Sequence, residues 1–467
     1  MIFLKLFDTS TYVDKDKVEG EIPKFKKVAK DVMKIVWPSM LEGFLVALVT
    51  MFDGIQVSSI GNDANSAVTI TKQPIFLMIS FIVAINIALT AIVSRRFGEN
   101  NQEAVNKTMH EGIKITTIVA IILSIIFCIF TEPLCKLMGA TVNTLEYAKT
   151  YLFIMSAGFI FNALRLTINA CQRGIGKTKI SMWTNLVANV VNICLNYVLI
   201  NGHFGFPQLG IAGAAFATII GNAVAFIISL LTILPSNGYL RLRIKNLFKL
   251  DNETLGNIGR ILPSTLLDQL LIRFGFIIFA LIVNYLGDDA TYVHGVCQDI
   301  NSLMFTLADG FSIGTAAIVG HRLGEKRKDL ALVYAKVSMI ISFACAILVS
   351  IFVVTCRGML IDLYKPETVY REDSAKLILM IAAIMMLPQN TSWVMTGILR
   401  GSGDTKFTAI VSLICVVLVR PISALVLCYP LGLGVLGAWI GMIFDQVVRL
   451  TLNTRRFRQK KWLQIKV

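Results

Sequence analysis

The sequence predicts an all-α integral membrane protein with about twelve transmembrane helices in two six-helix lobes. Of its 467 residues, 55% are hydrophobic and only 16% are charged, and the mean hydropathy is +0.70. In soluble domains about a quarter of the residues are charged, so this composition excludes a soluble domain. The other two observations are apolar runs long enough to cross a bilayer and an internal repeat.

The apolar runs predict the individual helices in chain order. A helix needs about 20 apolar residues to cross the hydrocarbon core. Runs of this kind predict spans at 36–60, 66–94, 112–131, 147–171, 180–200, 209–234, 260–286, 290–319, 333–355, 375–399, 406–428 and 434–454. Residues 1–35, which precede the first run, are expected to form an amphipathic segment on the cytoplasmic membrane surface.

The formal net charge of +15 is concentrated in segments that fall on one side of these spans. They are the N-terminal segment, Arg95/Arg96, Arg173–Lys179, Arg241–Lys249, Arg322–Lys328, Arg400/Lys406 and Arg455–Lys461. Basic loops stay on the cytoplasmic side, so a multi-pass protein of the cell membrane with both termini cytoplasmic is expected. The basic charge thus predicts topology and contact with anionic membrane lipid, and no nucleic-acid binding is expected.

The chain repeats itself once in the same direction. Three pairs of motifs recur at offsets of 226, 227 and 224 residues: SRRFGE (94–99) with GHRLGE (320–325), RGIGKTK (173–179) with RGSGDTK (400–406), and GIAGA (210–214) with GVLGA (434–438). WPSMLEG (37–43) likewise resembles LPSTLLDQ (262–269). An offset of six helices, an even number, gives both halves the same topology, related by a pseudo-twofold axis along the membrane normal.

The repeat also predicts the domain boundaries. The expected parts are an N-lobe at 36–235, a cytoplasmic linker at 236–259, a C-lobe at 260–454 and a basic cytoplasmic tail at 455–467. Two six-helix bundles of this kind leave a central cavity in which an alternating-access transporter holds its substrate.

Catalytic patterns find little support. Gly176-Lys-Thr suggests a phosphate loop, but Cys171 occupies the position where that loop needs a glycine. Gly310-Phe-Ser312-Ile-Gly314 matches GxSxG within an apolar run, where small residues favour close helix packing. The four histidines have no metal-site spacing and the nine cysteines no CxxC pair. No catalytic residue, metal or cofactor is predicted.

The ionisable residues inside the spans are more informative, because a carboxylate in hydrocarbon costs several kcal/mol unless it faces a cavity or a partner. Asp53 lies about seven residues before the outer end of the first span, and Pro38, earlier in the same span, is expected to bend that helix. Burial would let Asp53 load and release a proton; alternatively, neighbouring oxygens could help it to hold Na⁺.

Other charged residues leave alternatives open. Lys72 enters the second span about as deep as Asp53 leaves the first, so the two could form a purely structural ion pair. Glu42 and Asp268 lie nearer the cytoplasmic ends and could meet only interfacial water. Asp445 is expected to pair with Arg449, one turn later.

The span at 180–200 carries an amide stripe made of Asn185, Asn189, Asn192 and Asn196. The last three follow three- and four-residue spacing and therefore share one helix face. Such a stripe can line a cavity or hydrogen-bond to neighbouring helices, and the sequence leaves both interpretations open.

Three adjacent motifs carry a family resemblance: QRGIGKTK at 172–179, NVVNICLNYVLI at 189–200 and FGFPQLGIAGAAFAT at 204–218. With them, the chain resembles the multidrug and toxin extrusion (MATE) family from Pro38 to residue 462. The resemblance implies a twelve-helix, two-lobed exporter, acting by alternating access. It would use an H⁺ or Na⁺ gradient to expel cationic or amphipathic small molecules, most simply as a monomer.

The resemblance also implies a cation site in the N-lobe. Asp53 matches the family's acidic residue on the first helix, and Asn192, Asn196 and Thr218 match the polar residues that complete the site. Asn196 is an amide where some members carry a second carboxylate, which weakens the case for tight Na⁺ binding. Lys72 is atypical for its position.

For a second site in the C-lobe, Asp268 and Asp404 are the nearest matches to the carboxylates that other members carry on helices 7 and 10. Asp268 lies closer to its proline than in that pattern. The first alternative function is a lipid-linked oligosaccharide flippase, which the intramembrane Arg165, Arg273 and Arg420 keep open. A membrane-embedded enzyme is a remote second alternative, because it would need a convergent nucleophile or metal set.

Overall fold

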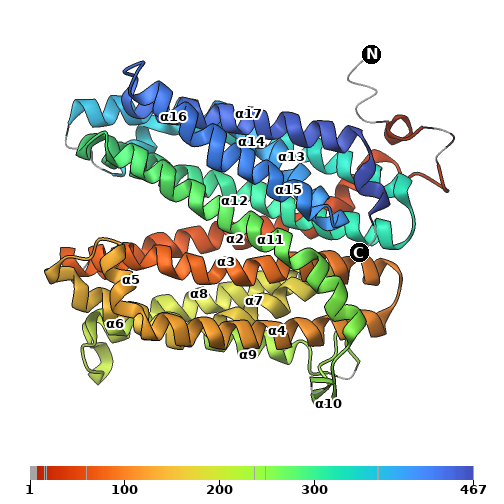
Figure 1. Cartoon of the computed structure of the whole chain (residues 1–467), viewed down its shortest axis with the longest axis horizontal. Coiled ribbons are helices and arrows are strands. Elements are labelled where there is room, and N and C mark those ends of the chain that lie inside the picture. Colours follow the sequence, from red (N-terminus) through yellow and green to blue (C-terminus); the bar gives the residue numbers. More distant parts are fainter. Residues whose placement is uncertain are drawn as a thin grey trace. The chain divides into compact units, whose positions relative to one another are not determined.

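The computed structural model describes residues 8–14, 16, 18–58, 60–235, 237–247, 249–364 and 368–465, without the side chains of residues 50–55, 58, 62, 244, 247 and 369. Within these ranges every regular element is a helix (Figure 1). Eleven helices are long and apolar enough to cross a membrane, or twelve if one bent pair forms a single span. The prediction of an all-α membrane protein with about twelve spans is confirmed.

The chain folds into two compact units, and the two members of each of the three main motif pairs lie in different units. Unit 1 comprises residues 1–43 and 263–467, and unit 2 comprises residues 44–262. Two long helices, α2 (Phe25–Ser58) and α11 (Asn252–Asn284), run from one unit into the other. The helix α2 begins at Phe25, whereas a surface segment was expected up to residue 35. Residues 25–35 therefore belong to the same helix as the first predicted span.

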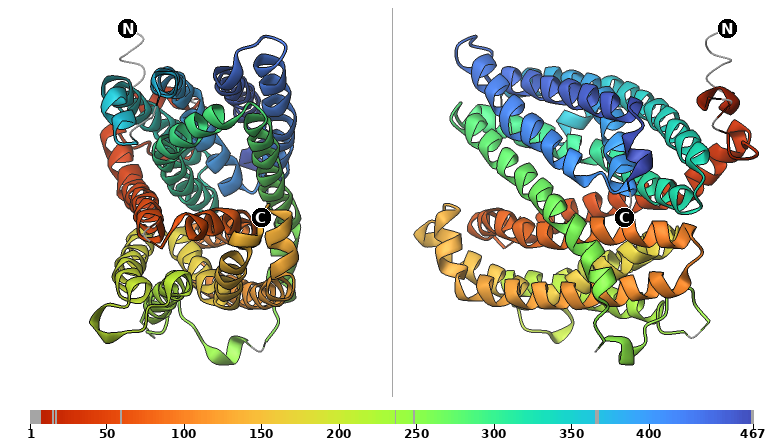
Figure 2. Two further views of the ribbon diagram at one scale, coloured as in Figure 1. Left: turned by 90° about the vertical axis from the view of Figure 1, so that its left-hand side faces the viewer. Right: turned by 45° about the vertical axis from the view of Figure 1, so that its right-hand side comes forward.

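Unit 2 contains the outer part of α2 and the helices that follow it in the N-terminal half of the chain. They are α3 (Asn62–Gly98), α4 (Gln102–Ile129), α5 (Thr131–Leu137), α6 (Val142–Ala157), α7 (Phe159–Gly174), α8 (Thr178–Asn201), α9 (Gly210–Leu231) and the short α10 (Ile244–Leu247). The helix α3 packs against α4, α6 and α7, and α9 packs against α6, α7 and α8. The helices of this unit, coloured from orange to yellow-green, lie together in both views of Figure 2.

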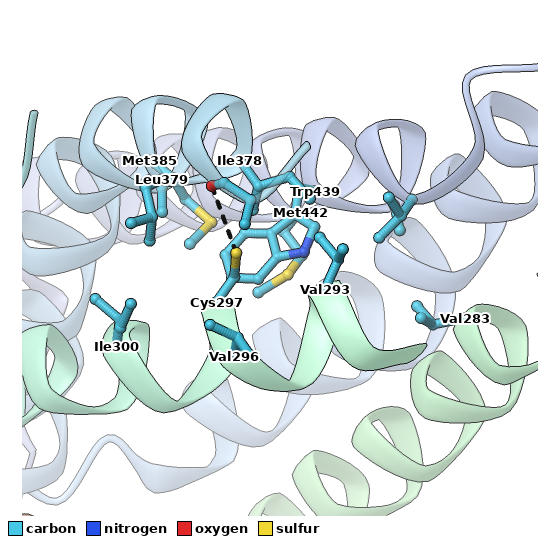
Figure 3. Close-up of a cluster of buried hydrophobic side chains, with 14 of the residues drawn as sticks. Val283, Val293, Val296, Cys297, Ile300, Ile378, Leu379, Met385, Trp439 and Met442 are labelled. Atoms are coloured by element: carbon cyan, nitrogen blue, oxygen red, sulfur yellow. Dashed lines mark hydrogen bonds between the residues drawn. The ribbon is translucent and has the colours of Figure 1, made fainter. Parts of the chain in front are cut away.

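Unit 1 contains the C-terminal helices: α12 (Asp288–Gly324), α13 (Lys328–Asp362), α14 (Val369–Ser402), α15 (Thr405–Ser412), a π-helical segment (Leu413–Val419), α16 (Arg420–Cys428) and α17 (Gly434–Arg458). The helix α14 is central, because it packs against α12, α13 and α17 (Figure 1). Their buried faces form an apolar core around Trp439 (Figure 3), where the Cys297 thiol donates a hydrogen bond to the Ala375 carbonyl oxygen over 3.6 Å.

The repeated motifs mark the same helix boundaries in both units. Each pair of motifs places a residue with positive φ at such a boundary. Asn100, with φ of +56°, lies between α3 and α4, and Lys326, with φ of +60°, lies between α12 and α13. Gly176 and Gly403, at +80° and +89°, follow α7 and α14, while Gly210 and Gly434 begin α9 and α17. A left-handed residue ends a helix by redirecting the chain, so the motifs recur where both halves need the same turn.

Two predicted spans differ from regular helices. The span at 147–171 is the bent pair α6 and α7, which meet at Gly158 with an angle of 48°. A Cβ atom on Gly158 would lie 2.4 Å from the Ile219 side chain of α9, so the glycine lets the bend approach α9 closely. The span at 406–428 contains the π-helical segment, because Pro421 offers no N–H group to the preceding turn.

Helices α12 and α14 meet through small residues. Gly397 and Gly401, one turn apart on α14, pack against the backbone of Ser312 and Ala316, and a Cβ on either glycine would lie 2.3 Å from a carbonyl oxygen. Gly310 and Gly314 of α12 pack in the same manner against α2. The GxSxG pattern therefore lies inside a helix and serves close helix packing, as predicted.

Replacement of Gly401 by alanine is expected to destabilise unit 1 by about 1–3 kcal/mol, because the added methyl group must push backbone away from backbone. Gly295→Ala on α12 is the matched control, since a Cβ there meets nothing within 4 Å. The thermal unfolding midpoints of the purified variants measure the difference. Equal midpoints for Gly401→Ala and the control would contradict close packing at this position.

The N-terminal segment is held on unit 1 by polar contacts with the start of α13. The Glu19 backbone N–H donates to Asp329 over 3.2 Å, and the Arg327 side chain donates to the Glu21 carbonyl oxygen over 3.3 Å. Lys336 donates to the Tyr12 carbonyl oxygen over 2.9 Å. The described part of this segment therefore covers one end of the C-terminal helices.

Candidate functional site

The predicted cation site is built on the outer part of α2 and on the helix pair α8 and α9, all within unit 2. Position 53 lies in α2, five residues before the helix ends at Ser58. The side chain of Asp53 lies outside the described residues. The geometry of the site therefore rests on the neighbouring polar side chains.

A hydrogen bond joins two of the predicted site residues across α8 and α9. The Asn192 side-chain amide donates to the Thr218 hydroxyl over 3.1 Å, and that hydroxyl donates to the Ala214 carbonyl oxygen over 3.0 Å. Asn196, one turn after Asn192, is only 1% exposed. The structure thus brings Asn192 and Thr218 together and buries Asn196 on the same side of α8.

Glycines in α9 allow this approach. A Cβ atom on Gly213 would lie 2.5 Å from the Leu199 carbonyl oxygen, and one on Gly221 would lie 2.8 Å from the Ala188 carbonyl oxygen. Only a residue without a side chain fits at either place. The spacing of the two glycines therefore fixes how closely α9 carries Thr218 to Asn192.

Gln56 brings α2 onto the same surface of α8. Its side-chain amide donates to the Ile193 carbonyl oxygen over 3.4 Å, between Asn192 and Asn196 in the chain. The sequence interpretation did not single out Gln56. Its position three residues after Asp53, which places both on one helix face, was the available signal.

The amide stripe of α8 divides into two parts. Asn185 accepts a hydrogen bond from Arg165 of α7, which also donates to Asn162 over 2.8 Å. Asn185 therefore serves contact between helices, whereas Asn192 faces α9 through Thr218. Asn192 thus also hydrogen-bonds to a neighbouring helix, which confirms that interpretation for Asn185 and Asn192. The interpretation that the stripe lines a cavity stays a prediction.

Three further residues of the N-terminal half were candidates: Lys72, Glu42 and Pro38. Lys72 is exposed on α3, and none of the ion pairs among the described side chains includes it. Its pairing with Asp53 stays a hypothesis. Glu42 is half-buried and belongs to unit 1, and Pro38 lies inside α2.

The C-lobe candidates are engaged in ion pairs. Asp268, which is fully buried, accepts hydrogen bonds from Arg400 over 2.7 Å and from Ser412 over 2.5 Å. The expectation that Asp268 meets only interfacial water was wrong, because two side chains from later in the chain enclose its carboxylate. Asp404 accepts two hydrogen bonds from Arg456, over 2.7 and 3.2 Å.

Asp445 also has a different main partner from the one expected. It accepts a hydrogen bond from Arg420 Nε over 2.9 Å and a second, shorter one from Arg420 Nη2. Arg449, the predicted partner, also forms an ion pair with Asp445, at 3.8 Å, so the predicted pair is confirmed but is the longer of the two. The π-helical segment directly precedes Arg420, so the local helix geometry that places this side chain was invisible to the spacing rule.

Trp393 connects these ion pairs. The guanidinium groups of Arg400 and Arg449 lie 5.5 and 5.7 Å from its ring centroid, and its indole N–H donates to Asp309 over 3.2 Å. The carboxylates that find donors inside unit 1 thus include Asp268, Asp309, Asp404 and Asp445. This arrangement suits a structural ionic network better than a second site for a coupling cation.

The family is decided by two matches to one family model. The model described as MatE matches residues 38–198 and again residues 264–425. The chain belongs to the MatE family. The two matches begin 226 residues apart, the offset at which the SRRFGE motif recurs, so they confirm the repeat and the predicted family.

The relatives of this MatE-family chain extend over nearly its whole length. A "Probable multidrug resistance protein NorM" of Thermotoga maritima is 28% identical, with 95% of this chain and 94% of the relative covered. An "Uncharacterized transporter YisQ" of Bacillus subtilis is 25% identical, with 93% and 95% covered. A solved structure, described as the outward-facing conformation of a multidrug resistance MATE family transporter of the MOP superfamily, superimposes with a TM-score of 0.86. It is 19% identical and covers 95% of this chain and 100% of its own, which shows a shared two-lobe MATE fold.

The alternative functions gain nothing from the site geometry. Two of the three intramembrane arginines that kept a flippase open are engaged within their own units, Arg165 with Asn185 and Arg420 with Asp445. No group of three metal-ligating side chains gathers among the residues that the structure describes. Burial raises the pKa of the Cys135 thiol to about 11, which keeps it protonated at neutral pH.

Proposed function

We propose that this MatE-family transporter is a secondary active exporter in the cell membrane that expels organic cations or amphipathic molecules in exchange for H⁺ or Na⁺. Family membership supports export, and the relatives described as probable multidrug resistance proteins support the substrate class. The observation that carries the coupling proposal is the convergence of Gln56, Asn192 and Thr218 beside position 53.

The level of Asp53 follows from helix geometry. In the predicted topology α2 and α8 are both odd-numbered spans and run in the same direction. Gln56 contacts the Ile193 carbonyl, and three residues correspond to about 4.5 Å along a helix. Position 53 therefore lies near the level of Asn189 and Asn192, within the polar surface of α8.

A carboxylate beside amide and hydroxyl oxygens can bind either coupling ion. Protonation removes the charge that is costly in an apolar bundle, and Na⁺ would be held by Asp53 together with side-chain oxygens of Asn192, Asn196 and Thr218. Either ion neutralises the group that attracts a cationic substrate. Ion and substrate therefore disfavour each other, and this mutual effect is the basis of exchange.

Pro38 supplies a place for α2 to move. Proline has no N–H group for the carbonyl four residues earlier, so α2 can bend there without breaking that hydrogen bond. In the proposed cycle, an inward-open form loads substrate, the lobes rock, and ion binding at Asp53 bends α2 and closes the pocket. The chain acts as a monomer in membrane lipid with both termini cytoplasmic.

Efflux of ethidium from vesicles that contain the purified protein tests the proposal. An inward-directed H⁺ gradient and an inward-directed Na⁺ gradient are imposed separately, with an ionophore that collapses each gradient as the control. One gradient is expected to drive export, and this result would identify the ion. No export above protein-free vesicles under either gradient would refute exchange of this substrate class.

A further inference from the structure

A cavity of about 650 Å³ lies within unit 2, between the first part of α4 and the chain segment 238–251 that leads into α11. It is separate from Asp53 and the α8–α9 surface. The predicted membrane span of α4 begins at residue 112, after the α4 residues that line the cavity. The cavity therefore borders the headgroup layer on the cytoplasmic side. Its lining is polar and carries charges of both signs, with four basic and three acidic side chains.

The wall of this cavity is fixed by hydrogen bonds from α4. The Arg241 backbone N–H donates to the Asn106 side-chain oxygen over 2.6 Å, and the Asn106 amide group donates to the Tyr239 carbonyl oxygen over 3.1 Å. Gln102 donates to the same carbonyl over 2.8 Å. The backbone of the segment is therefore docked along one face of α4, and its basic side chains project from that fixed backbone.

Two buried residues fix the other end of the segment. His110 Nε2 accepts a hydrogen bond from the Arg243 backbone N–H over 3.0 Å, and Glu111 Oε1 accepts one from the Asp251 backbone N–H over 3.0 Å. His110 and Glu111 are each only 2% exposed. Both line the cavity, so it has a buried polar floor as well as a charged rim.

The charges of the rim are unevenly paired. Lys107 pairs with Glu103 over 3.1 Å, and Glu111 pairs with Lys114 over 2.5 Å. Arg243 and Lys249 are exposed at the cavity and take part in none of the ion pairs among the described side chains. The cavity therefore offers two basic groups for an external anion.

The buried Glu111 carboxylate at the floor of the cavity adds a requirement that a ligand would have to meet. Glu111 Oε2 is buried and has no hydrogen-bond partner among the described residues, although the Oε1 atom of the same carboxylate has two. A ligand that carries only negative charge would leave this oxygen unsatisfied. A ligand with a phosphate and a neighbouring ammonium or hydroxyl donor would satisfy both the rim and the floor.

We propose that this cavity binds a phosphate group through Arg243 and Lys249, with a hydrogen-bond donor of the same ligand directed at Glu111. Ethanolamine phosphate, as a lipid headgroup or as a free solute, has this chemistry. The position beside the headgroup layer favours the lipid, because basic side chains near the cytoplasmic membrane surface attract phosphate headgroups. Binding would hold the segment that joins the two repeats on α4.

Native mass spectrometry of the purified full-length protein tests the proposal with three lipids of equal acyl chains. Phosphatidylethanolamine has both groups, phosphatidylcholine has the phosphate without the donor, and diacylglycerol has neither. We expect affinity to fall in that order. The double substitution Arg243→Gln/Lys249→Gln is expected to lower phosphatidylethanolamine affinity about 10- to 30-fold, since two basic contacts are lost.

The matched control is Lys177→Gln/Lys245→Gln, which removes the same charge from exposed residues that do not line the cavity. Free phosphoethanolamine forms a second arm. If it raises the melting temperature of the wild-type protein but not of the Arg243/Lys249 variant, the cavity also takes the soluble form. Equal affinity for phosphatidylethanolamine and diacylglycerol, or equal loss in both double variants, would overturn the proposal. Because the readout is binding, the result does not depend on the transport activity proposed above.

Discussion

Asp53→Asn is expected to reduce gradient-driven ethidium export to the level of protein-free vesicles while the protein stays folded. Asparagine keeps the size of the side chain but can neither take up a proton nor offer a negative charge to Na⁺. Export then loses its only proposed link to the gradient. The initial rate of ethidium efflux from energised vesicles measures the effect.

Asp63→Asn is the matched control, because Asp63 is an exposed carboxylate at the start of α3 and its substitution removes the same charge. This variant is expected to export at the wild-type rate. A gel-filtration profile and a melting temperature establish that both variants are folded. Full gradient-driven export by Asp53→Asn would remove Asp53 from the coupling mechanism, whatever the control does.

The second large effect is expected at the Arg420–Asp445 ion pair. Asp445 is fully buried and Arg420 is 4% exposed, so Asp445→Leu leaves an uncompensated guanidinium inside the C-terminal bundle. Removal of one partner of a buried pair typically costs about 3–5 kcal/mol. Arg420→Met is expected to be similarly destabilising, because it leaves the carboxylate without its main donor.

The double variant Arg420→Met/Asp445→Leu distinguishes this electrostatic cause from a simple loss of packing. With Arg420 and Asp445 both replaced, neither member of this pair is left facing a missing partner, and the only other ion pair lost among the described side chains is the longer contact of Asp445 with Arg449, at 3.8 Å. Much of the lost stability is therefore expected to return. Thermal unfolding midpoints of the four purified proteins complete the double-mutant cycle. If the losses of the two single variants simply add in the double variant, the pair is not coupled and the described network is wrong.

Much of the fold could be predicted because a helix that crosses a bilayer needs a long apolar run, and such runs are visible in the sequence. The repeated motifs could be recognised because each places a left-handed residue at the same helix end, as at Gly176 and Gly403. The bend at Gly158 could not be foreseen, since it depends on contact with Ile219 of a helix two spans later. Pro421 was a local signal for an irregular helix before Arg420, but the spacing of apolar residues does not give the π-helical form.

The candidate site shows a similar division. The family resemblance indicated Asn192 and Thr218, and the structure joins them by a hydrogen bond. The partner of Asp268 lies 132 residues later in the sequence, at Arg400, and no local spacing rule can reach that far. Gln56 could have been noted from its place one turn after Asp53, but its contact with α8 needs the three-dimensional structure.

Equilibrium binding of ethidium to purified wild-type and Asp53→Asn protein, at varied pH and at varied Na⁺ concentration, tests the central claim most directly. If ion and substrate compete through Asp53, wild-type affinity will fall as the coupling ion binds, and the affinity of Asp53→Asn will not respond to that ion. An equal response to the ion in both proteins would contradict a coupling site at Asp53.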